Sequence, residues 1–225
     1  MDWSEIPIDI YCERLDASFW SEPFNAFTNA AFLIAAVAAW LRYRNARRVD
    51  VWLFLLIVNI ALIAFGSFVF HTFATRGAAL FDTIPIALFV YSYLALALSR
   101  FIGLRPAVVA IIVIAFVAVS QFLPLFVPRN TLNGSVEYLP PLLALFVVGL
   151  FSRPGKVMRG LLIGGVVFTV SLAFRTVDMA ICGAFPLGTH FIWHMINAWV
   201  LYWLMATAID ASVPEQRHAE ASASA

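Results

Sequence analysis

The sequence has few charged residues: aspartate, glutamate, lysine and arginine make up 12% of its 225 residues. A soluble domain has about a quarter of its residues charged and about half apolar. Here 63% of the residues are hydrophobic. This composition excludes an ordinary soluble globular protein and indicates a polytopic membrane protein built as one bundle. The net charge of +1 predicts no nucleic-acid partner.

The N-terminus lacks the basic stretch that precedes the apolar core of a cleavable signal peptide. The charged residues that precede the first apolar run are mostly acidic, so this run is expected to be retained as a membrane span. The connections between the apolar runs are also short, and no convincing internal repeat is present. No soluble domain is therefore expected between the spans.

Seven apolar runs follow one another along the chain, and most are long enough to cross about 30 Å of hydrocarbon as a helix. They are expected at 24–42, 51–71, 79–99, 106–126, 137–152, 158–177 and 189–209. Pro140 and Pro141 mark a first turn or a kink near the start of the short fifth run. The predicted fold class is an all-α, seven-transmembrane helix bundle over residues 1–210. A disordered cytoplasmic tail is expected over residues 211–225.

The basic residues are distributed unequally between the two sides of the predicted bundle. One side carries Arg42, Arg44, Arg47, Arg48, Arg100, Arg105, Arg153, Lys156, Arg159 and Arg217. The other side carries Arg14, Arg76, Arg129 and Arg175. The positive-inside rule then places the N-terminus outside and the C-terminus in the cytoplasm. For a bacterial source this predicts an inner-membrane protein whose outer end faces the periplasm, and for a eukaryote the outer end faces the lumen or the exterior.

Histidine is rare, and three of the four histidines fall near the outer boundary of the predicted bundle. His71 ends the second span, His190 and His194 begin the seventh, and His218 lies in the tail. The i, i+4 spacing of His190 and His194 puts both on one helical face, as a chelating pair requires. Three histidine ligands that leave a position for water are typical of catalytic zinc. The alternative is that these histidines form hydrogen bonds between helices.

Two further polar residues lie close to His71 in the sequence. Ser67 is four residues earlier on the same helical face, and Asp82 lies just inside the third span. A carboxylate inside a span costs roughly 2.5 kcal/mol or more unless it finds a partner or water. Asp82 is therefore a candidate general acid/base, and Ser67 a candidate donor to a developing oxyanion. The alternatives are a helix contact for Ser67, and an ion pair of Asp82 with Arg76 or Arg175.

Taken together, these motifs resemble those of the alkaline ceramidase family, within a superfamily of seven-span proteins that includes the adiponectin receptors. The resemblance covers nearly the whole chain in span number, orientation and motif order. It implies that His71, His190 and His194 bind zinc. It also implies that Asp82 is the acid/base and that Ser67 stabilises the transition state. The implied reaction is hydrolysis of the amide of ceramide or another N-acyl membrane lipid to a fatty acid and a free amine, in which zinc polarises the carbonyl and supplies hydroxide.

The N-terminal segment resembles the same family less completely. Alkaline ceramidases carry a calcium site around an Asp-Trp-Cys-Glu-x-Asn stretch and a later Glu. Here "IYCERL" keeps Cys12 and Glu13, and Glu22 precedes the first span, but Ile10 and Leu15 replace the Asp and Asn. The candidate calcium ligands are Glu13, Glu22, Asp9 and Asp16. The alternative is an acidic segment whose carboxylates cap helices.

The chain has only two cysteines, and both fall on the predicted outer side. Cys12 lies in the N-terminal segment and Cys182 in the connection before the seventh span. A disulfide can persist on this oxidising side, where it would tie the acidic segment over the connection that leads to His190. The alternative is two independent buried thiols.

Two other functions are compatible with the same sequence. One is a lipid-sensing receptor with the same zinc-bearing core, which would favour a long folded cytoplasmic extension. The other is a transporter or channel that uses Asp82 and the histidines as a proton relay. The relay predicts ionisable residues that continue toward the inner face, where the spans have few. The expected partner is a membrane lipid substrate, and no obligate protein partner is expected.

Overall fold

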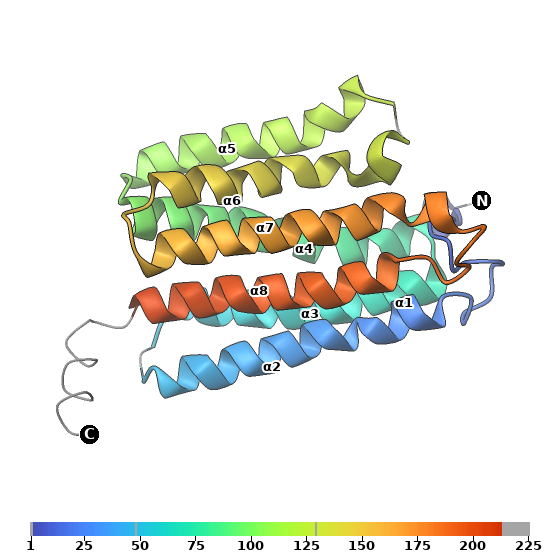
Figure 1. The fold of residues 1–225 in the computed structure, drawn as a ribbon, viewed down its shortest axis with the longest axis horizontal. Coiled ribbons are helices and arrows are strands. Elements are labelled where there is room, and N and C mark those ends of the chain that lie inside the picture. Colours follow the sequence, from blue (N-terminus) through green and yellow to red (C-terminus); the bar gives the residue numbers. More distant parts are fainter. Residues whose placement is uncertain (1, 48, 129, 213–225) are drawn as a thin grey trace.

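Seven long apolar helices dominate the computed structural model, which describes residues 2–47, 49–128 and 130–212. Each is long and apolar enough to cross a membrane, and they lie side by side in one bundle (Figure 1). The expected all-α, seven-span fold is therefore confirmed, and the chain is an integral, multi-pass membrane protein. Of the tail expected at 211–225, Ala211 and Ser212 continue the last helix. The other tail residues lie outside the described part of the chain.

The seven spans agree with the predicted runs to within a few residues, except that the fifth begins earlier. In chain order they are α1 (Pro23–Thr28) with α2 (Ala30–Asn45), α3 (Val51–Phe73), α4 (Arg76–Ala97) with the π-helical turn η2 (Leu98–Ile102), α5 (Pro106–Phe122) with η3 (Leu123–Phe126), η4 (Thr131–Tyr138) with α6 (Leu139–Phe151), α7 (Lys156–Val177) and α8 (His190–Ser212). Two short 3₁₀ turns, η1 (Trp3–Glu5) and η5 (Met179–Ile181), lie outside the spans. Pro140 and Pro141 occupy the first turn of α6, where a missing N–H costs no helical hydrogen bond.

Apolar side chains at the centre of the bundle are completely buried. They include Leu53 and Ile60 of α3, Leu96 of α4, and Met205 and Ile209 of α8. The helix α5 differs, because only 11% of its apolar stretch is buried and it lies at the edge of the bundle (Figure 1). Helices satisfy their own backbone hydrogen bonds, so the apolar outer surface of such a bundle can face lipid.

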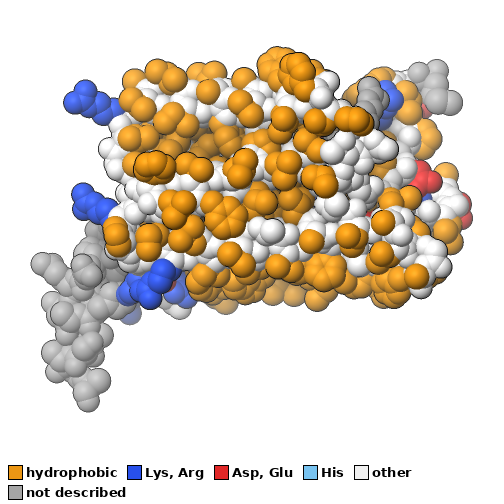
Figure 2. Space-filling view, turned by 45° about the horizontal axis from the view of Figure 1, so that its top comes forward, with side chains coloured by type: hydrophobic (Ala, Val, Ile, Leu, Met, Phe, Trp, Pro, Cys, Tyr) orange, Lys and Arg blue, Asp and Glu red, His pale blue; other side chains and the backbone are white. Residues whose placement is uncertain are grey.

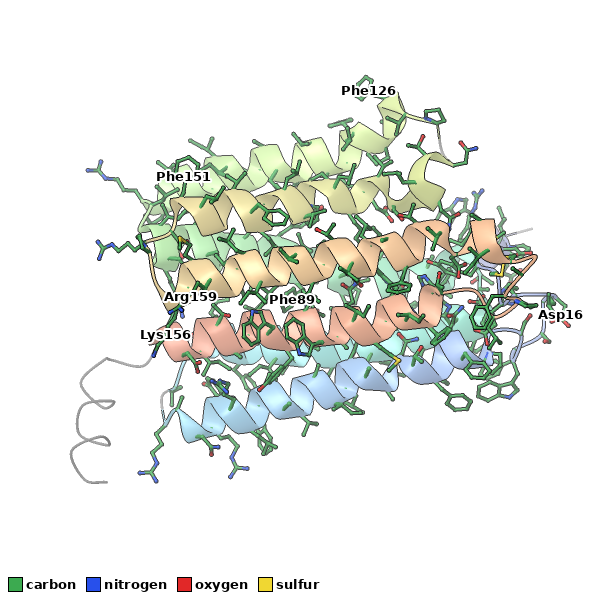
Figure 3. The ribbon with its side chains drawn as sticks, viewed as in Figure 1. Asp16, Phe89, Phe126, Phe151, Lys156 and Arg159 are labelled. Atoms are coloured by element: carbon green, nitrogen blue, oxygen red, sulfur yellow. A yellow bond between two sulfur atoms is a disulfide. The ribbon has the colours of Figure 1, made fainter. Side chains whose placement is uncertain are left out.

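The two ends of the bundle carry different charges. Figure 2 shows hydrophobic side chains along the length of the molecule, with most of the visible Lys and Arg at one end and Asp and Glu at the other. The basic end includes Lys156 and Arg159, and Asp16 lies at the opposite end (Figure 3). The ends of α3 and α7 and the starts of α4 and α8 meet at this opposite end (Figure 1), so the predicted site residues gather there.

The N-terminal segment lies against the connection between α3 and α4. The Ile8 N–H donates to the Ala74 carbonyl at 2.7 Å, and the Arg76 N–H donates to the Ile6 carbonyl at 3.0 Å. The Thr75 side chain caps α4 by accepting from the Ala78 N–H at 3.2 Å. These bonds hold the acidic segment beside the helix ends that carry the candidate site.

Direct contact between the backbones of α3 and α4 depends on Gly66. A Cβ atom at this position would lie 1.8 Å from the Phe81 carbonyl oxygen and 3.2 Å from the Asp82 nitrogen. Only glycine allows this approach, since any side chain would push the helices apart. Gly66 carries no signal in the sequence, because a close backbone contact leaves no motif.

Replacing Gly66 by alanine is expected to destabilise the protein by about 1–3 kcal/mol, because α3 and α4 must separate to admit the methyl group. The same shift moves Asp82 away from α3. Thermal unfolding of the purified protein measures the loss. Gly183→Ala is the matched control, because a Cβ atom there meets nothing within 4 Å. Equal melting temperatures for Gly66→Ala and wild type would contradict the expected contact.

Candidate metal centre

Three buried histidines converge at the end of the bundle where the N-terminal segment lies. His71 is in the last turn of α3, and His190 and His194 are in the first two turns of α8. One ligand nitrogen from each lies within 4.8 Å of the others, and their side chains are almost fully buried. The i, i+4 pair of α8 and the single histidine of α3 can therefore hold one metal ion. Three imidazoles are a donor set that zinc prefers.

Hydrogen bonds orient two of the three imidazole rings. His71 Nδ1 lies 2.6 Å from Glu22 Oε2, and His194 Nδ1 lies 3.0 Å from Thr28 Oγ1. The Thr28 hydroxyl donates to the backbone of its own helix, so it accepts the proton of His194 Nδ1. Histidines that bind metals commonly donate their second nitrogen in this way. Sequence reasoning missed Thr28, since a hydroxyl in the first span carries no metal-site signal.

Buried nitrogen atoms without partners also fit a metal site. His71 Nε2 and His190 Nδ1 are buried and have no hydrogen-bond partner among the described residues. Buried polar atoms are nearly always hydrogen-bonded, so unpartnered nitrogens on converging rings call for an explanation. A metal ion that accepts their lone pairs supplies one.

Asp82 and Ser67 lie in the same cavity as the α8 histidines. Both side chains line this cavity together with His190 and His194. Ser67 is buried and lies next to the Asp82 carboxyl, whose buried Oδ1 has no hydrogen-bond partner among the described residues. The structure thus brings together all five residues of the predicted catalytic constellation.

Neither alternative ion pair of Asp82 is formed in the described structure. Arg76 is exposed, with its guanidinium over the ring of Trp3 at 5.8 Å. Arg175 lies 3.9 Å from Glu137, and its NH1 group donates to the Ser135 hydroxyl at 2.9 Å. The Asp82 carboxyl is therefore available to a ligand in the cavity.

The cavity extends from the histidines into the membrane-spanning part of the bundle. Its wall is mostly apolar and includes Ile63, Phe89, Leu145, Phe168, Val200 and Leu204. Phe89 lies about midway along the bundle, between the end with Asp16 and the end with Lys156 and Arg159 (Figure 3). The arrangement therefore combines a polar centre near one end with an apolar space that reaches toward the middle of the bundle.

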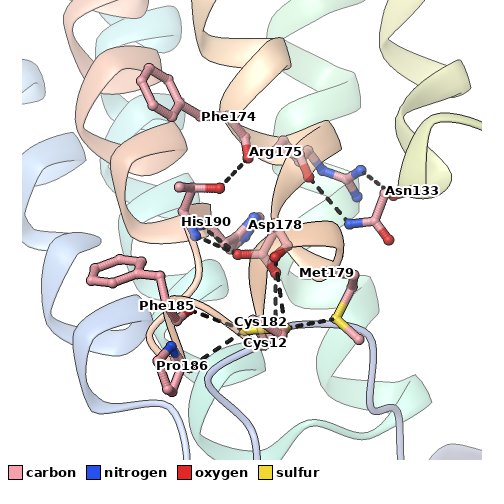
Figure 4. The surroundings of a disulfide bond; sticks show 11 residues. Cys12, Asn133, Phe174, Arg175, Asp178, Met179, Cys182, Phe185, Pro186 and His190 are labelled. Carbon is pink, nitrogen blue, oxygen red and sulfur yellow. Dashed lines mark hydrogen bonds between the residues drawn. A yellow bond between two sulfur atoms is a disulfide. The ribbon is translucent and has the colours of Figure 1, made fainter.

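Asp178 fixes the start of α8 and the N-terminal segment together. Its Oδ1 accepts from the N–H groups of Thr189 at 2.6 Å and His190 at 2.9 Å, and its Oδ2 accepts from the Cys12 N–H at 2.9 Å (Figure 4). Gly188 has a φ of +63°, and a Cβ atom there would lie 2.2 Å from Asp178 Oδ1. A buried carboxylate at a helix N-terminus is stabilised by the free N–H groups. Asp178 therefore positions His190 through the backbone of α8.

The spacing of Arg175 and Asp178 predicts an ion pair between them. This prediction is wrong. The Asp178 oxygens accept from backbone N–H groups, and Arg175 donates to the Asn133 carbonyl and the Ser135 hydroxyl in η4. Each group finds partners on other segments of the chain, which the spacing cannot reveal.

Cys12 and Cys182 form a disulfide with a Cα–Cα distance of 5.5 Å (Figure 4). The bond joins the N-terminal segment to the connection before α8. The adjacent Tyr11 stacks on His190 with ring centroids 3.7 Å apart, and its ring lies 5.3 Å from that of His71. Tyr11 thus covers the histidine cluster from the N-terminal side, a contact that no motif in the sequence predicts.

Reduction of the disulfide is expected to lower the melting temperature of wild type, since the cross-link closes a loop of 170 residues. Disulfides typically contribute about 2–5 kcal/mol. The Cys12→Ser/Cys182→Ser protein is the control and should melt at one temperature with or without reductant. Mass mapping of non-reduced protein from its native membrane should recover the linked peptides. Two free thiols would contradict the bond.

The predicted calcium ligands do not form one site. Glu13 accepts from the N–H groups of Phe24 at 2.6 Å and Asn25 at 2.8 Å, so it caps α1, as the alternative interpretation proposed. Burial raises the pKa of Glu13, although these two N–H groups oppose the rise. Asp9 and Asp16 are exposed. Within the described part of the chain, the histidines are the only group of three or more such ligands close enough to share a metal ion.

Glu22, the remaining predicted calcium ligand, forms hydrogen bonds with other side chains. Its Oε1 accepts from Arg14 Nε at 2.5 Å, and its Oε2 lies beside His71 Nδ1 and accepts from Asn25 Nδ2 at 3.0 Å. Burial raises the pKa of Glu22, but the bonds from His71, Arg14 and Asn25 outweigh it and hold the pKa below its ordinary value. These four residues therefore do not fit a calcium site, because Arg14 already supplies the positive charge at Glu22.

Comparison with known proteins adds no independent identification of the chain. No family model matches it, and no curated protein sequence does either. The fold and the site define a seven-helix membrane protein with a buried three-histidine centre.

Proposed function

We propose that the protein is a zinc-dependent membrane amidohydrolase. Its reaction is cleavage of the N-acyl amide of ceramide or a related lipid to a fatty acid and a free amine. The observation that carries this proposal is the convergence of His71, His190 and His194, two of which line one apolar cavity together with Asp82 and Ser67. These residues come from three helices and lie in the arrangement that metal-assisted hydrolysis requires.

The three histidines are the proposed zinc ligands. When bound by three neutral imidazoles, zinc polarises a carbonyl group and makes water more acidic. Glu22 and Thr28 support this role, because each accepts a hydrogen bond from the second nitrogen of a histidine ligand. Asp178 holds the first turn of α8, which keeps His190 directed at His71.

Asp82 is the proposed general acid/base. Its carboxylate takes the proton of the attacking water and returns it to the nitrogen of the leaving amine. The described residues leave Asp82 Oδ1 without a partner, as this function requires. Ser67 lies beside Asp82 and donates a hydrogen bond to the oxyanion that develops on the substrate carbonyl.

The cavity supports a substrate with a long apolar chain. Its aliphatic and aromatic walls can accept an acyl chain, while the amide lies near the histidines and Asp82. The choice of an N-acyl lipid rests on the motif resemblance together with this combination of apolar space and hydrolytic residues. Such lipids reside in the bilayer that the bundle spans.

The charge distribution supports an active site on the outer side of the membrane. The histidines lie at the end opposite Lys156 and Arg159, and the positive-inside rule assigns the basic end to the cytoplasm. The proposed location is a bacterial inner membrane with the site toward the periplasm, or the lumenal side in a eukaryote.

Metal analysis and a substrate screen test the proposal together. The protein is purified without chelator, its zinc is measured by elemental analysis, and released fatty acid is measured over a panel of N-acyl lipids. One zinc per chain and release of fatty acid support the proposal. A zinc-loaded protein that binds these lipids without hydrolysing them would support the lipid-sensing receptor instead. The absence of zinc would contradict both.

A further inference from the structure

Arg14 is a buried cation beside the histidine cluster. Its side chain is 4% exposed and donates three hydrogen bonds. Nε binds Glu22 Oε1 at 2.5 Å, NH1 binds the Asp16 carbonyl at 3.0 Å, and NH2 binds the His71 carbonyl at 3.0 Å. The guanidinium thus lies among three oxygen atoms, two from the N-terminal segment and one from the end of α3.

Glu22 connects Arg14 to the proposed metal centre. One oxygen of the carboxylate binds Arg14 and the other lies 2.6 Å from His71 Nδ1. The Glu22 side chain is 2% exposed, so without a cation its charge would be buried and uncompensated. The guanidinium on the other side of Glu22 therefore stabilises the carboxylate that orients His71.

We propose that Arg14 is the built-in cation of this centre, so that assembly of the metal site needs no calcium. The inference rests on the metal centre of the proposed function. The oxygens around the guanidinium, one carboxylate and two carbonyls, are of the type that calcium binds. The guanidinium occupies them with fixed hydrogen bonds and is always charged. Arg14 is thus a positioning residue that acts on His71 through Glu22.

The first experiment measures zinc affinity and melting temperature in the purified full chain, in buffer with millimolar calcium or in buffer from which calcium has been removed beforehand. We expect wild type to give the same zinc affinity and melting temperature in both. Arg14→Ala should bind zinc about 10–100-fold more weakly than wild type in calcium-free buffer, as expected when support for a metal-binding histidine is lost. Arg14→Lys should keep part of the affinity, because it retains the charge but not the fork of donors.

The second experiment tests whether calcium can bind the oxygens that the Arg14 guanidinium contacts in wild type. Removing it in Arg14→Ala leaves the oxygens of Glu22, Asp16 and His71 without their donor. Millimolar calcium should then raise the melting temperature and zinc affinity of this variant and leave wild type unchanged. Arg76→Ala is the matched control, since it removes an exposed arginine from the same end of the bundle. It should behave as wild type does.

Adding Glu22→Gln to Arg14→Ala distinguishes a loss of stability from a loss of the hydrogen bond that orients His71. The double variant Arg14→Ala/Glu22→Gln removes both charges, so in calcium-free buffer it should melt above Arg14→Ala while its zinc affinity stays low. A helical far-UV spectrum for each variant shows that the fold is present.

Three results would overturn the inference. They are wild-type zinc affinity in Arg14→Ala, a calcium-dependent melting temperature in wild type, and no calcium response in Arg14→Ala. Wild type that binds zinc but hydrolyses no N-acyl lipid would refute the proposed function alone. The readouts for Arg14 are zinc affinity and melting temperature, so they do not depend on turnover.

Discussion

Replacing His71 by alanine is expected to remove the zinc from the protein and abolish hydrolysis of lipid amides. The change leaves only His190 and His194 on α8, and two imidazoles cannot replace the three-ligand set of a catalytic zinc site. Zinc per chain is measured by elemental analysis and turnover by released fatty acid. The double replacement of His190 and His194 should give the same result, since it leaves one ligand.

The matched control for His71→Ala is Gln121→Ala, which changes an exposed polar residue on the peripheral helix α5. It should retain the zinc and the activity of wild type. Far-UV circular dichroism checks that the helical content of each variant is unchanged. A His71→Ala protein that still holds one zinc per chain and turns over lipid would refute the proposed centre.

Replacing Asp82 by asparagine is expected to lower turnover by about 10²–10⁴-fold, the usual contribution of a general acid/base. The amide has nearly the shape of the carboxylate but cannot accept the proton of water. Zinc content should stay close to that of wild type, since Asp82 is not one of the clustered ligands. The melting temperature should hold or rise slightly, because a costly charge leaves the membrane-spanning region. Steady-state turnover, zinc content and lipid binding are measured on the same preparation.

Ser67→Ala provides the comparison for Asp82→Asn. It removes one hydrogen-bond donor beside Asp82 and should reduce turnover less, because the zinc ligands and the acid/base remain. Full activity in Asp82→Asn would exclude the proposed acid/base. Loss of zinc in Asp82→Asn would make Asp82 a fourth ligand, and a closed structural site would then explain the cluster better.

Much of the fold can be predicted from the sequence, because apolar runs of span length are a local property. A helix in lipid satisfies its own backbone groups, so the length and polarity of each run suffice to define the span. The same counting places His71, His190 and His194 at a common depth, and Asp82 near them. Topology alone brings the ends of α3 and α8 and the start of α4 to one end of the bundle.

Tertiary contacts explain why the predicted calcium ligands do not form one site. Glu13 and Glu22 have the expected positions along the chain, but Glu13 caps α1 and Glu22 binds Arg14 and His71. A carboxylate in a sequence can bind a metal ion, a helix end or a guanidinium. Which of these it binds depends on the groups that the fold brings within about 3 Å.

The sequence by itself determined the membrane class, the seven spans and the candidate zinc ligands, because hydropathy and i, i+4 spacing depend only on residue order. Only the tertiary structure decided which residues support that centre. Tyr11 stacks on His190, Asp178 holds the start of α8, and Arg14 reaches His71 through Glu22. These contacts join residues far apart in the chain. Gly188 permits the approach of Asp178 to the start of α8, and Gly66 permits that of α3 to α4. Such distances follow from how the helices pack, which no local pattern of residues specifies.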